Sequence, residues 1–112
     1  MTQSALSETP APLVLLSYDV SSINRSAASR VAHLIFGRKD AGPDSPVPYI
    51  LRAGVVWIGQ SVFLLPRSLA MELAEELHGL GAMVTMGNVS MPRREIESFQ
   101  RRARQRRVVQ SG

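Results

Sequence analysis

Apolar residues follow two kinds of pattern in the first third of the chain. Residues 13–20, LVLLSYDV, form a short apolar run rich in strand-forming side chains, which predicts a buried strand with Asp19 near its end. Residues 22–37 then carry an apolar stripe at helical spacing, which predicts a helix capped by Ser22 and ended by Gly37. The stripe consists of Ile23, Ala27, Val31, Leu34 and Ile35.

The longest apolar region, residues 49–66, is too long for one ordinary strand. Gly59 is poorly suited to a strand interior, and Gln60 and Ser61 add polar turn character. We therefore predict two strands that meet at this point. A single strand with a bulge at the glycine is the alternative. The preceding residues 38–48 contain three prolines and a glycine, which predict a loop.

The rest of the pattern predicts a helix, a strand and another helix. Residues 67–81 place leucines at helical spacing on one face, with glutamates mostly off that face. These leucines are Leu69, Leu73, Leu77 and Leu80. Residues 82–89 predict the last strand. Pro92 then opens a third helix, in which a narrow apolar stripe is surrounded by arginines. That stripe consists of Ile96, Phe99 and Ala103.

The order strand, helix, strand, strand, helix, strand is the ferredoxin-like βαββαβ pattern of an α+β protein. It predicts a four-stranded antiparallel sheet with two helices on one face, formed by one domain over residues 13–89. Residues 1–12 are expected to be a disordered lead, and residues 90–112 a basic C-terminal helix or tail. The helices leave one sheet face open, so we expect a homodimer through that face. Trp57 and Phe63 are the candidate contacts, and core packing is the alternative role for them, particularly for Phe63.

Charge is distributed unevenly along the chain. Residues 91–112 carry seven arginines and two glutamates, so this segment has a net charge of +5 while the rest of the chain has −1. A basic segment of this kind suggests nucleic acid as the partner, and a solvated helix that keeps the protein soluble is the alternative. There is no cysteine. No apolar run is long enough to cross a bilayer, and no secretory signal is visible. We therefore expect a cytoplasmic protein without membrane contact.

Two stretches of the chain resemble known families. LVLLSYDV, an arginine in the next helix and then GVVWIGQSVFLLP resemble the small nuclease-like protein of CRISPR adaptation, which is the partner of the integrase. The family-typical positions are Tyr18, Asp19, Val20, Arg25, Gly54, Gln60, Ser61, Val62 and Phe63. SVFLLP, the helix after it and GLGAMVTM also look like the N-terminal domain of chromate-resistance regulators and of phenylacetate-pathway repressors. The segment between Asp19 and Gly54 is longer than in the adaptation family because of the proline-rich loop.

The resemblance implies a role for Asp19. In the adaptation family, equivalent aspartates from two subunits approach each other and can hold a divalent metal such as Mg²⁺, which can activate water against a phosphodiester. The alternative is that Asp19 caps the following helix or pairs with Arg25. No other cofactor is suggested by the sequence.

Three functions follow as hypotheses. The favoured one is a small dimeric nucleic-acid-binding module, with DNA preferred to RNA, that serves as a structural subunit of a larger DNA-handling complex. Its candidate contacts are Arg25, Arg93, Arg94, Arg101, Arg102, Arg104, Arg106 and Arg107. The second is a metal-dependent nuclease with paired Asp19 as the catalytic and metal-binding residue. The third is the dimerisation or sensor domain of a regulator.

Overall fold

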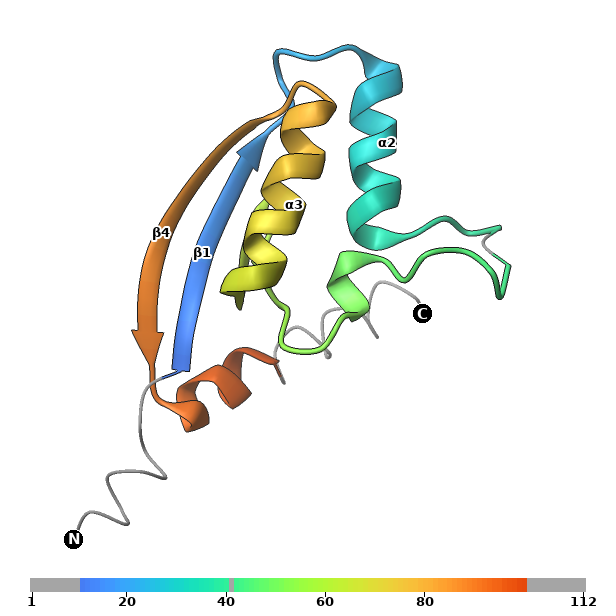
Figure 1. Cartoon of the computed structure of the whole chain (residues 1–112). Helices are drawn as coiled ribbons and strands as arrows, with labels where there is room; N and C mark the ends of the chain where they lie inside the picture. The colour runs from blue at the N-terminus through green and yellow to red at the C-terminus, as the bar shows by residue number, and fades with distance from the viewer. Residues whose placement is uncertain (1–10, 41, 101–112) are drawn as a thin grey trace, which may run out of the picture.

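A computed structural model describes residues 11–40 and 42–100, in which two helices cover one face of a four-stranded antiparallel sheet (Figure 1). The elements are β1 (Ala11–Asp19), α2 (Arg25–Phe36), the short 3₁₀ helix η1 (Tyr49–Leu51), β2 (Val56–Gly59), β3 (Val62–Pro66), α3 (Arg67–Gly79) and β4 (Met83–Met91). Residues 93–100 form a further helix after β4. The predicted order of strands and helices is therefore present.

The strands lie in the order β2-β3-β1-β4, and each neighbouring pair is antiparallel. The first and last strands of the chain thus pair with each other, and β4 forms one edge of the sheet. This α+β architecture is compatible with the ferredoxin-like pattern. The long β1–β4 pairing runs from Ala11 opposite Met91 to Asp19 opposite Met83, so it extends along the whole sheet.

The long apolar region contains a hairpin, as the sequence predicts. β2 and β3 meet at Gln60 and Ser61, and Gln60 has a φ of 44°, which is a left-handed conformation typical of tight turns. A shift of register between Trp57 and Gly59 adds a bulge. The indole N–H of Trp57 donates to the Gln60 carbonyl at 3.1 Å, which fixes the turn. Both features weighed from the sequence, the turn and the bulge, therefore occur together.

The first residues of that region do not belong to a strand, which corrects the prediction. Tyr49–Leu51 forms η1, and the Tyr49 side chain is 1% exposed. Pro48 precedes this helix, and the Leu51 N–H donates to its carbonyl at 3.0 Å. The proline-rich segment before it is a loop, as predicted.

The start of α2 also differs from the prediction, whereas its end agrees. Asn24, rather than Ser22, caps the helix, because its side-chain oxygen accepts the Ala27 N–H at 2.8 Å. At the other end Gly37 adopts a φ of 90°, and its N–H donates to the His33 carbonyl at 2.9 Å. A glycine is favoured here because the left-handed region is costly for residues with a Cβ.

The core lies between the sheet and the two helices. Sheet side chains at its centre, such as Leu16 and Leu65, have no exposed surface. The buried side chains that form this cluster are Val14, Leu16, Val31, Ile35, Tyr49, Phe63, Leu65, Ala70, Leu73, Ala74, Leu77 and Ala82. Alternate residues of β1 and β3 therefore belong to the core, because successive strand side chains point to opposite faces.

The second face of the sheet is partly covered. Leu13, Val56 and Leu64 are buried but lie outside the core cluster, and the register places Leu15 and Val56 beside Leu64. Leu15 is nevertheless 40% exposed. Met83, which pairs with Asp19 on the same face, is 64% exposed. The exposed apolar part of this face thus lies over β1 and β4.

Candidate functional site

The two candidate dimer contacts lie on the helix-covered side of the sheet. Phe63 is 1% exposed and belongs to the core cluster, which is the alternative role considered for it. Trp57 pairs with Phe63 across the hairpin and is half-buried. The Phe36 ring meets the Trp57 ring edge-on, with centroids 5.5 Å apart. Neither Trp57 nor Phe63 therefore lies on the second face of the sheet.

The helix after β4 presents the first arginines of the basic segment. The Pro92 carbonyl accepts the N–H groups of Glu95 and Ile96 at 3.0 and 3.2 Å and so begins the helix. Ile96 and Phe99 are half-buried, whereas Arg93 and Arg94 are exposed. The helix thus turns an apolar side inward and arginines outward. Arg101, Arg102, Arg104, Arg106, Arg107 and the stripe residue Ala103 lie outside the described residues.

Arg25 lies at the opposite end of the sheet from these arginines. It is the first residue of α2, which follows the end of β1 at Asp19. Arg93 and Arg94 follow the end of β4, which lies beside the start of β1. Nine residues of β1 separate the two ends, a length of about 30 Å at about 3.3 Å per residue. Arg25 therefore does not form one local patch with Arg93 and Arg94.

Asp19 lies at the end of β1 and is exposed. One of its carboxylate oxygens accepts the Ser21 N–H at 2.8 Å. This hydrogen bond lowers the pKa of Asp19, so the side chain is ionised at neutral pH. It neither caps α2, a role that Asn24 fills, nor forms an ion pair with Arg25 among the described contacts. Its observed role is to close the turn after β1.

No group of three or more His, Asp or Glu side chains that could hold a metal ion occurs in the described part of the chain. A metal ion at Asp19 would therefore take its other ligands from water, a second copy or bound nucleic acid. The protein contributes one carboxylate to such a site, and this is a small part of the oxygen shell that Mg²⁺ requires.

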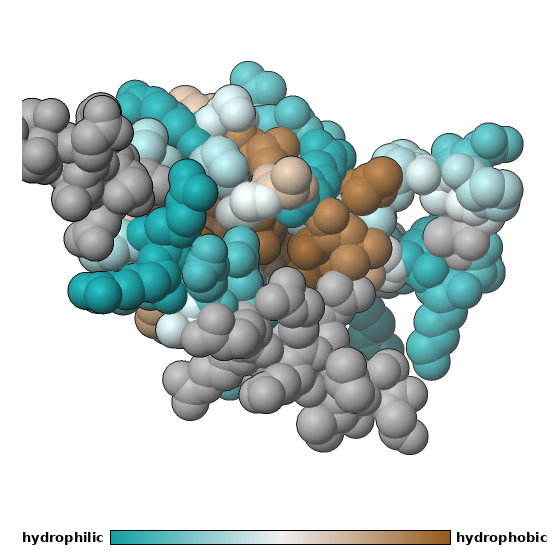
Figure 2. All heavy atoms as spheres, turned by 90° about the horizontal axis from the view of Figure 1, so that it is seen from below, coloured by the Kyte–Doolittle hydropathy of each residue, from teal (hydrophilic) through white to brown (hydrophobic). Residues whose placement is uncertain are grey.

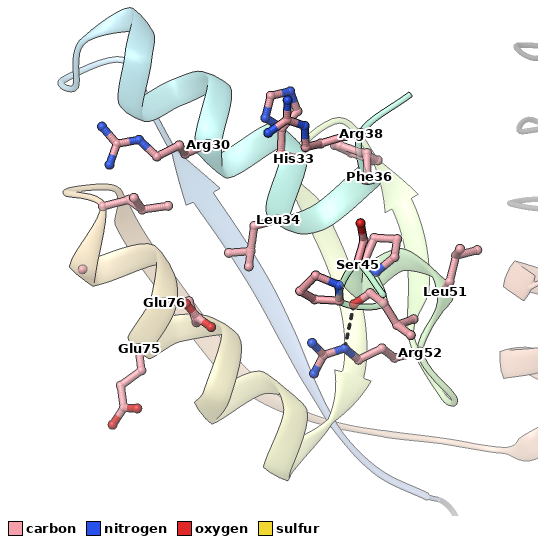
Figure 3. Close-up of a pocket in the computed structure, with 16 residues that line it drawn as sticks. Arg30, His33, Leu34, Phe36, Arg38, Ser45, Leu51, Arg52, Glu75 and Glu76 are labelled. Atoms are coloured by element: carbon pink, nitrogen blue, oxygen red, sulfur yellow. Dashed lines mark hydrogen bonds between the residues drawn. The ribbon is translucent and has the colours of Figure 1, made fainter. Parts of the chain in front are cut away.

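A groove of about 1010 Å³ lies between α2, α3 and the segment that leads into η1 (Figure 3). Leu34 points into it from α2, and Glu76 is turned toward it from α3. Arg30 and His33 stand on the α2 wall. The groove continues to an apolar end formed by Phe36, Val47 and Leu51, which are 40%, 55% and 52% exposed. Seen from below, hydrophobic side chains gather on this end of the molecule (Figure 2).

A polar network holds that end of the groove in place. The Tyr49 hydroxyl donates to Glu72 Oε2 at 2.5 Å, and Arg52 Nη1 donates to the same oxygen at 2.6 Å. The Arg52 guanidinium also stacks over the Tyr49 ring at 3.9 Å, and its Nε donates to the Val47 carbonyl at 3.2 Å, drawn dashed in Figure 3. These contacts join the loop and η1 to α3.

The network shifts two pKa values in opposite directions. The Tyr49 hydroxyl and the Arg52 guanidinium stabilise the charged carboxylate and lower the pKa of Glu72. Burial, together with the hydrogen bond to Glu72, raises the pKa of Tyr49. The tyrosine therefore stays protonated and donates its hydrogen bond. This network was not predicted from the sequence, because its three members come from two separate elements. The only local signal is a tyrosine between a proline-rich loop and an apolar run.

No protein-family model, no curated protein and no solved structure matches this chain. No helix within the described ranges has both the length and the apolar composition of a membrane span.

Proposed function

We propose that this chain is a small nucleic-acid-binding module that acts as a homodimer and contacts phosphates through the arginines of residues 91–112. The observation that carries the proposal is the concentration of charge. The segment has a net charge of +5, whereas the remaining chain has −1. A polyanion would therefore be attracted to one part of the molecule and not to the rest.

The helix at residues 93–100 supports this assignment. Ile96 and Phe99 are half-buried, so the apolar side of the helix is packed more closely than the side that carries the arginines. Arg93 and Arg94 are exposed and can reach phosphates while that packing is kept. The sequence contains no recognised base-reading motif, so we expect contacts mostly with the phosphate backbone and little sequence preference. The resemblance to the adaptation family extends the proposal to a subunit of a DNA-handling complex.

The test measures binding to duplex DNA and duplex RNA by fluorescence anisotropy over a salt series. Binding should weaken steeply as salt rises, because each neutralised phosphate adds about 0.9 to the log–log slope on duplex DNA. Replacing both Arg93 and Arg94 with Gln should lower that slope by up to about 1.8. The matched control replaces Arg30 and Arg38 with Gln, which removes the same charge from the α2 region.

The outcomes distinguish a local binding site at Arg93 and Arg94 from a general effect of the protein's net charge. An unchanged slope in the Arg30→Gln/Arg38→Gln control, beside a lower slope in the Arg93→Gln/Arg94→Gln variant, would support the proposal. Equal losses in both variants would show that net charge alone matters. Absence of binding by the wild-type protein at low salt would rule out nucleic acid as the partner.

A metal-dependent nuclease is the second candidate, and the exposure of an ionised Asp19 at a strand end favours it. The observed site supplies only this carboxylate from each chain, so catalysis requires two Asp19 side chains at one metal ion. Cleavage with Mg²⁺ or Mn²⁺ that disappears in Asp19→Ala would establish the activity. If Asp19→Ala cleaves nucleic acid as well as the wild type does, the cleavage does not depend on Asp19.

A further inference from the structure

The two edges of the sheet differ in length and regularity. β2, at one edge, has four residues and a bulge between Trp57 and Gly59. β4, at the other edge, has nine residues and pairs with β1 at nine consecutive positions without a bulge. Short and bulged edge strands discourage pairing with another chain, whereas long regular ones permit it. The β4 edge therefore lacks the two protective features of the β2 edge.

The β4 strand also has no charged side chain. Residues 79–92 contain no Asp, Glu, Lys or Arg, although one residue in five of the whole chain is charged. Natural edge strands usually carry charged side chains or proline to prevent pairing, and β4 has neither. Its exposed apolar side chains include Met83 and Met86, at 64% and 39%. Within the described ranges, the backbone of β4 pairs with β1 alone.

We propose that the free edge of β4 pairs antiparallel with β4 of a second copy, so that two four-stranded sheets join into one of eight strands. A second copy fits this edge because two identical antiparallel strands can be related by a two-fold axis that passes between their central residues. A charged side chain close to that axis would lie near the same side chain of the second copy and be repelled by it. β4 contains no charged residue. The pairing would also satisfy the outward-facing N–H and C=O groups of both strands.

Full overlap of the two strands defines the register. Gly87 lies at the centre, so Met86 is opposite Asn88 of the second copy, and Thr85 is opposite its Val89. Both Met86 and Asn88 are exposed, so neither side chain would leave the core. The glycine at the centre allows the two backbones to approach closely. The pairing is therefore possible without repacking either subunit.

This arrangement has a consequence for Asp19. Asp19 lies beside Met83, at the start of β4. The starts of two antiparallel β4 strands lie at opposite ends of the pair, about 30 Å apart for nine residues. The two Asp19 side chains would thus be too far apart to share a metal ion. Edge pairing therefore opposes the nuclease hypothesis with paired Asp19.

The test uses charge-reversed pairs in the full-length chain and measures mass by sedimentation equilibrium. The first variant, Met86→Lys/Asn88→Lys, would bring like charges together across the two-fold axis. The second, Met86→Glu/Asn88→Glu, would do the same with opposite sign. Each variant alone is expected to shift from the dimer to the 12.3 kDa monomer. An equimolar mixture of the two is expected to recover the dimer. Leu15→Gln, on the second face of the sheet, is the matched control and should remain dimeric.

Three results would overturn the proposal. The wild-type chain could be monomeric at every concentration. Both charged variants could stay dimeric while Leu15→Gln dissociates, which would place the contact on the second face. The mixture could stay monomeric although circular dichroism shows each variant folded, which would show that positions 86 and 88 do not face each other. Since nucleic acid is absent from the experiment, its result does not bear on the proposed phosphate contacts of the arginines. A monomeric wild type would remove the homodimer from the proposed function and leave those contacts to the salt series.

Discussion

Leu15 and Leu16 are neighbours in β1, but the two faces of the sheet give them different surroundings. Leu16 is fully buried between the sheet and the helices, whereas Leu15 is 40% exposed on the second face. The helix-covered face contains a continuous core, and the second face is covered only in part, at Leu13, Val56 and Leu64. The side chains on one face of the strand therefore form the core, whereas part of the other face stays exposed and can contact another molecule.

The largest expected effect comes from truncating the two leucines in turn. Leu16→Ala should lower the free energy of unfolding by about 2–5 kcal/mol, because it leaves a cavity in the core. Leu15→Ala should cost less than about 1 kcal/mol, since much of its side chain already contacts water. Urea denaturation of both variants measures the difference. Equal losses would mean that the second face is as well packed as the first.

A smaller effect is expected at Gly54, shortly before β2 begins. Gly54 has a φ of 86°, and a Cβ at this position would lie 2.8 Å from Pro66 Cγ. Gly54→Ala should therefore cost about 1–3 kcal/mol through backbone strain and the close contact. Gly42→Ala is the control, because a Cβ there meets nothing within 4 Å. Its unfolding free energy should change by no more than about 0.5 kcal/mol. A neutral Gly54→Ala would show that the turn can relax.

The polar network of Tyr49, Arg52 and Glu72 should contribute less to the free energy of unfolding than the features above. Tyr49→Phe removes the hydroxyl that donates to Glu72, and should cost about 0.5–1.5 kcal/mol. Tyr18→Phe is the matched control, since no hydrogen bond of its hydroxyl is found in residues 11–40 and 42–100. Thermal or urea unfolding at neutral pH compares the two. A larger loss in Tyr18→Phe would contradict the role assigned to the Tyr49 hydroxyl.

The smallest effect is a pH dependence that arises from Glu72. Its pKa is lowered in the folded protein by Tyr49 and Arg52, so the folded state favours the ionised carboxylate. This contribution to stability is present above the unfolded pKa of about 4.5 and is lost as the pH falls through the lower folded pKa. Unfolding measured between neutral and acid pH should show a shallower fall in stability for Glu72→Gln than for the wild type. Parallel curves would show that Glu72 does not contribute.

Local patterns predicted most of the elements because their signals are short-range. The hairpin followed from Gly59, Gln60 and Ser61 within one apolar region, and the end of α2 from Gly37, which adopts a φ that favours glycine. The start of α2 was misplaced because Ser22 and Asn24 are both good capping residues, and only the observed hydrogen bond to Ala27 selects one. Tyr49–Leu51 was assigned to a strand because its apolar residues resemble one when taken alone.

The candidate site could be predicted only as a list of residue types. The charge count identified the basic segment, but not that Arg25 lies at the other end of the sheet from Arg93. The aromatic residues Trp57 and Phe63 were candidates for a contact surface. The alternation along β3 turns Phe63 into the core, and Trp57 packs against Phe36 on the same side. Residues far apart in sequence, such as Arg52 and Glu72, meet only because η1 and α3 are adjacent in the fold.

The sequence by itself determined the α+β class, the order of the elements, the hairpin turn and the separation of charge, because each depends on neighbouring residues or on composition. Tertiary structure alone decided which leucines are buried, which strand lies at the edge and which polar groups meet. Strand pairing set these features, since β4 is nearly the last element of the chain and yet pairs with the first strand. Its long uncharged edge became visible as a surface only once β1 had occupied its other side.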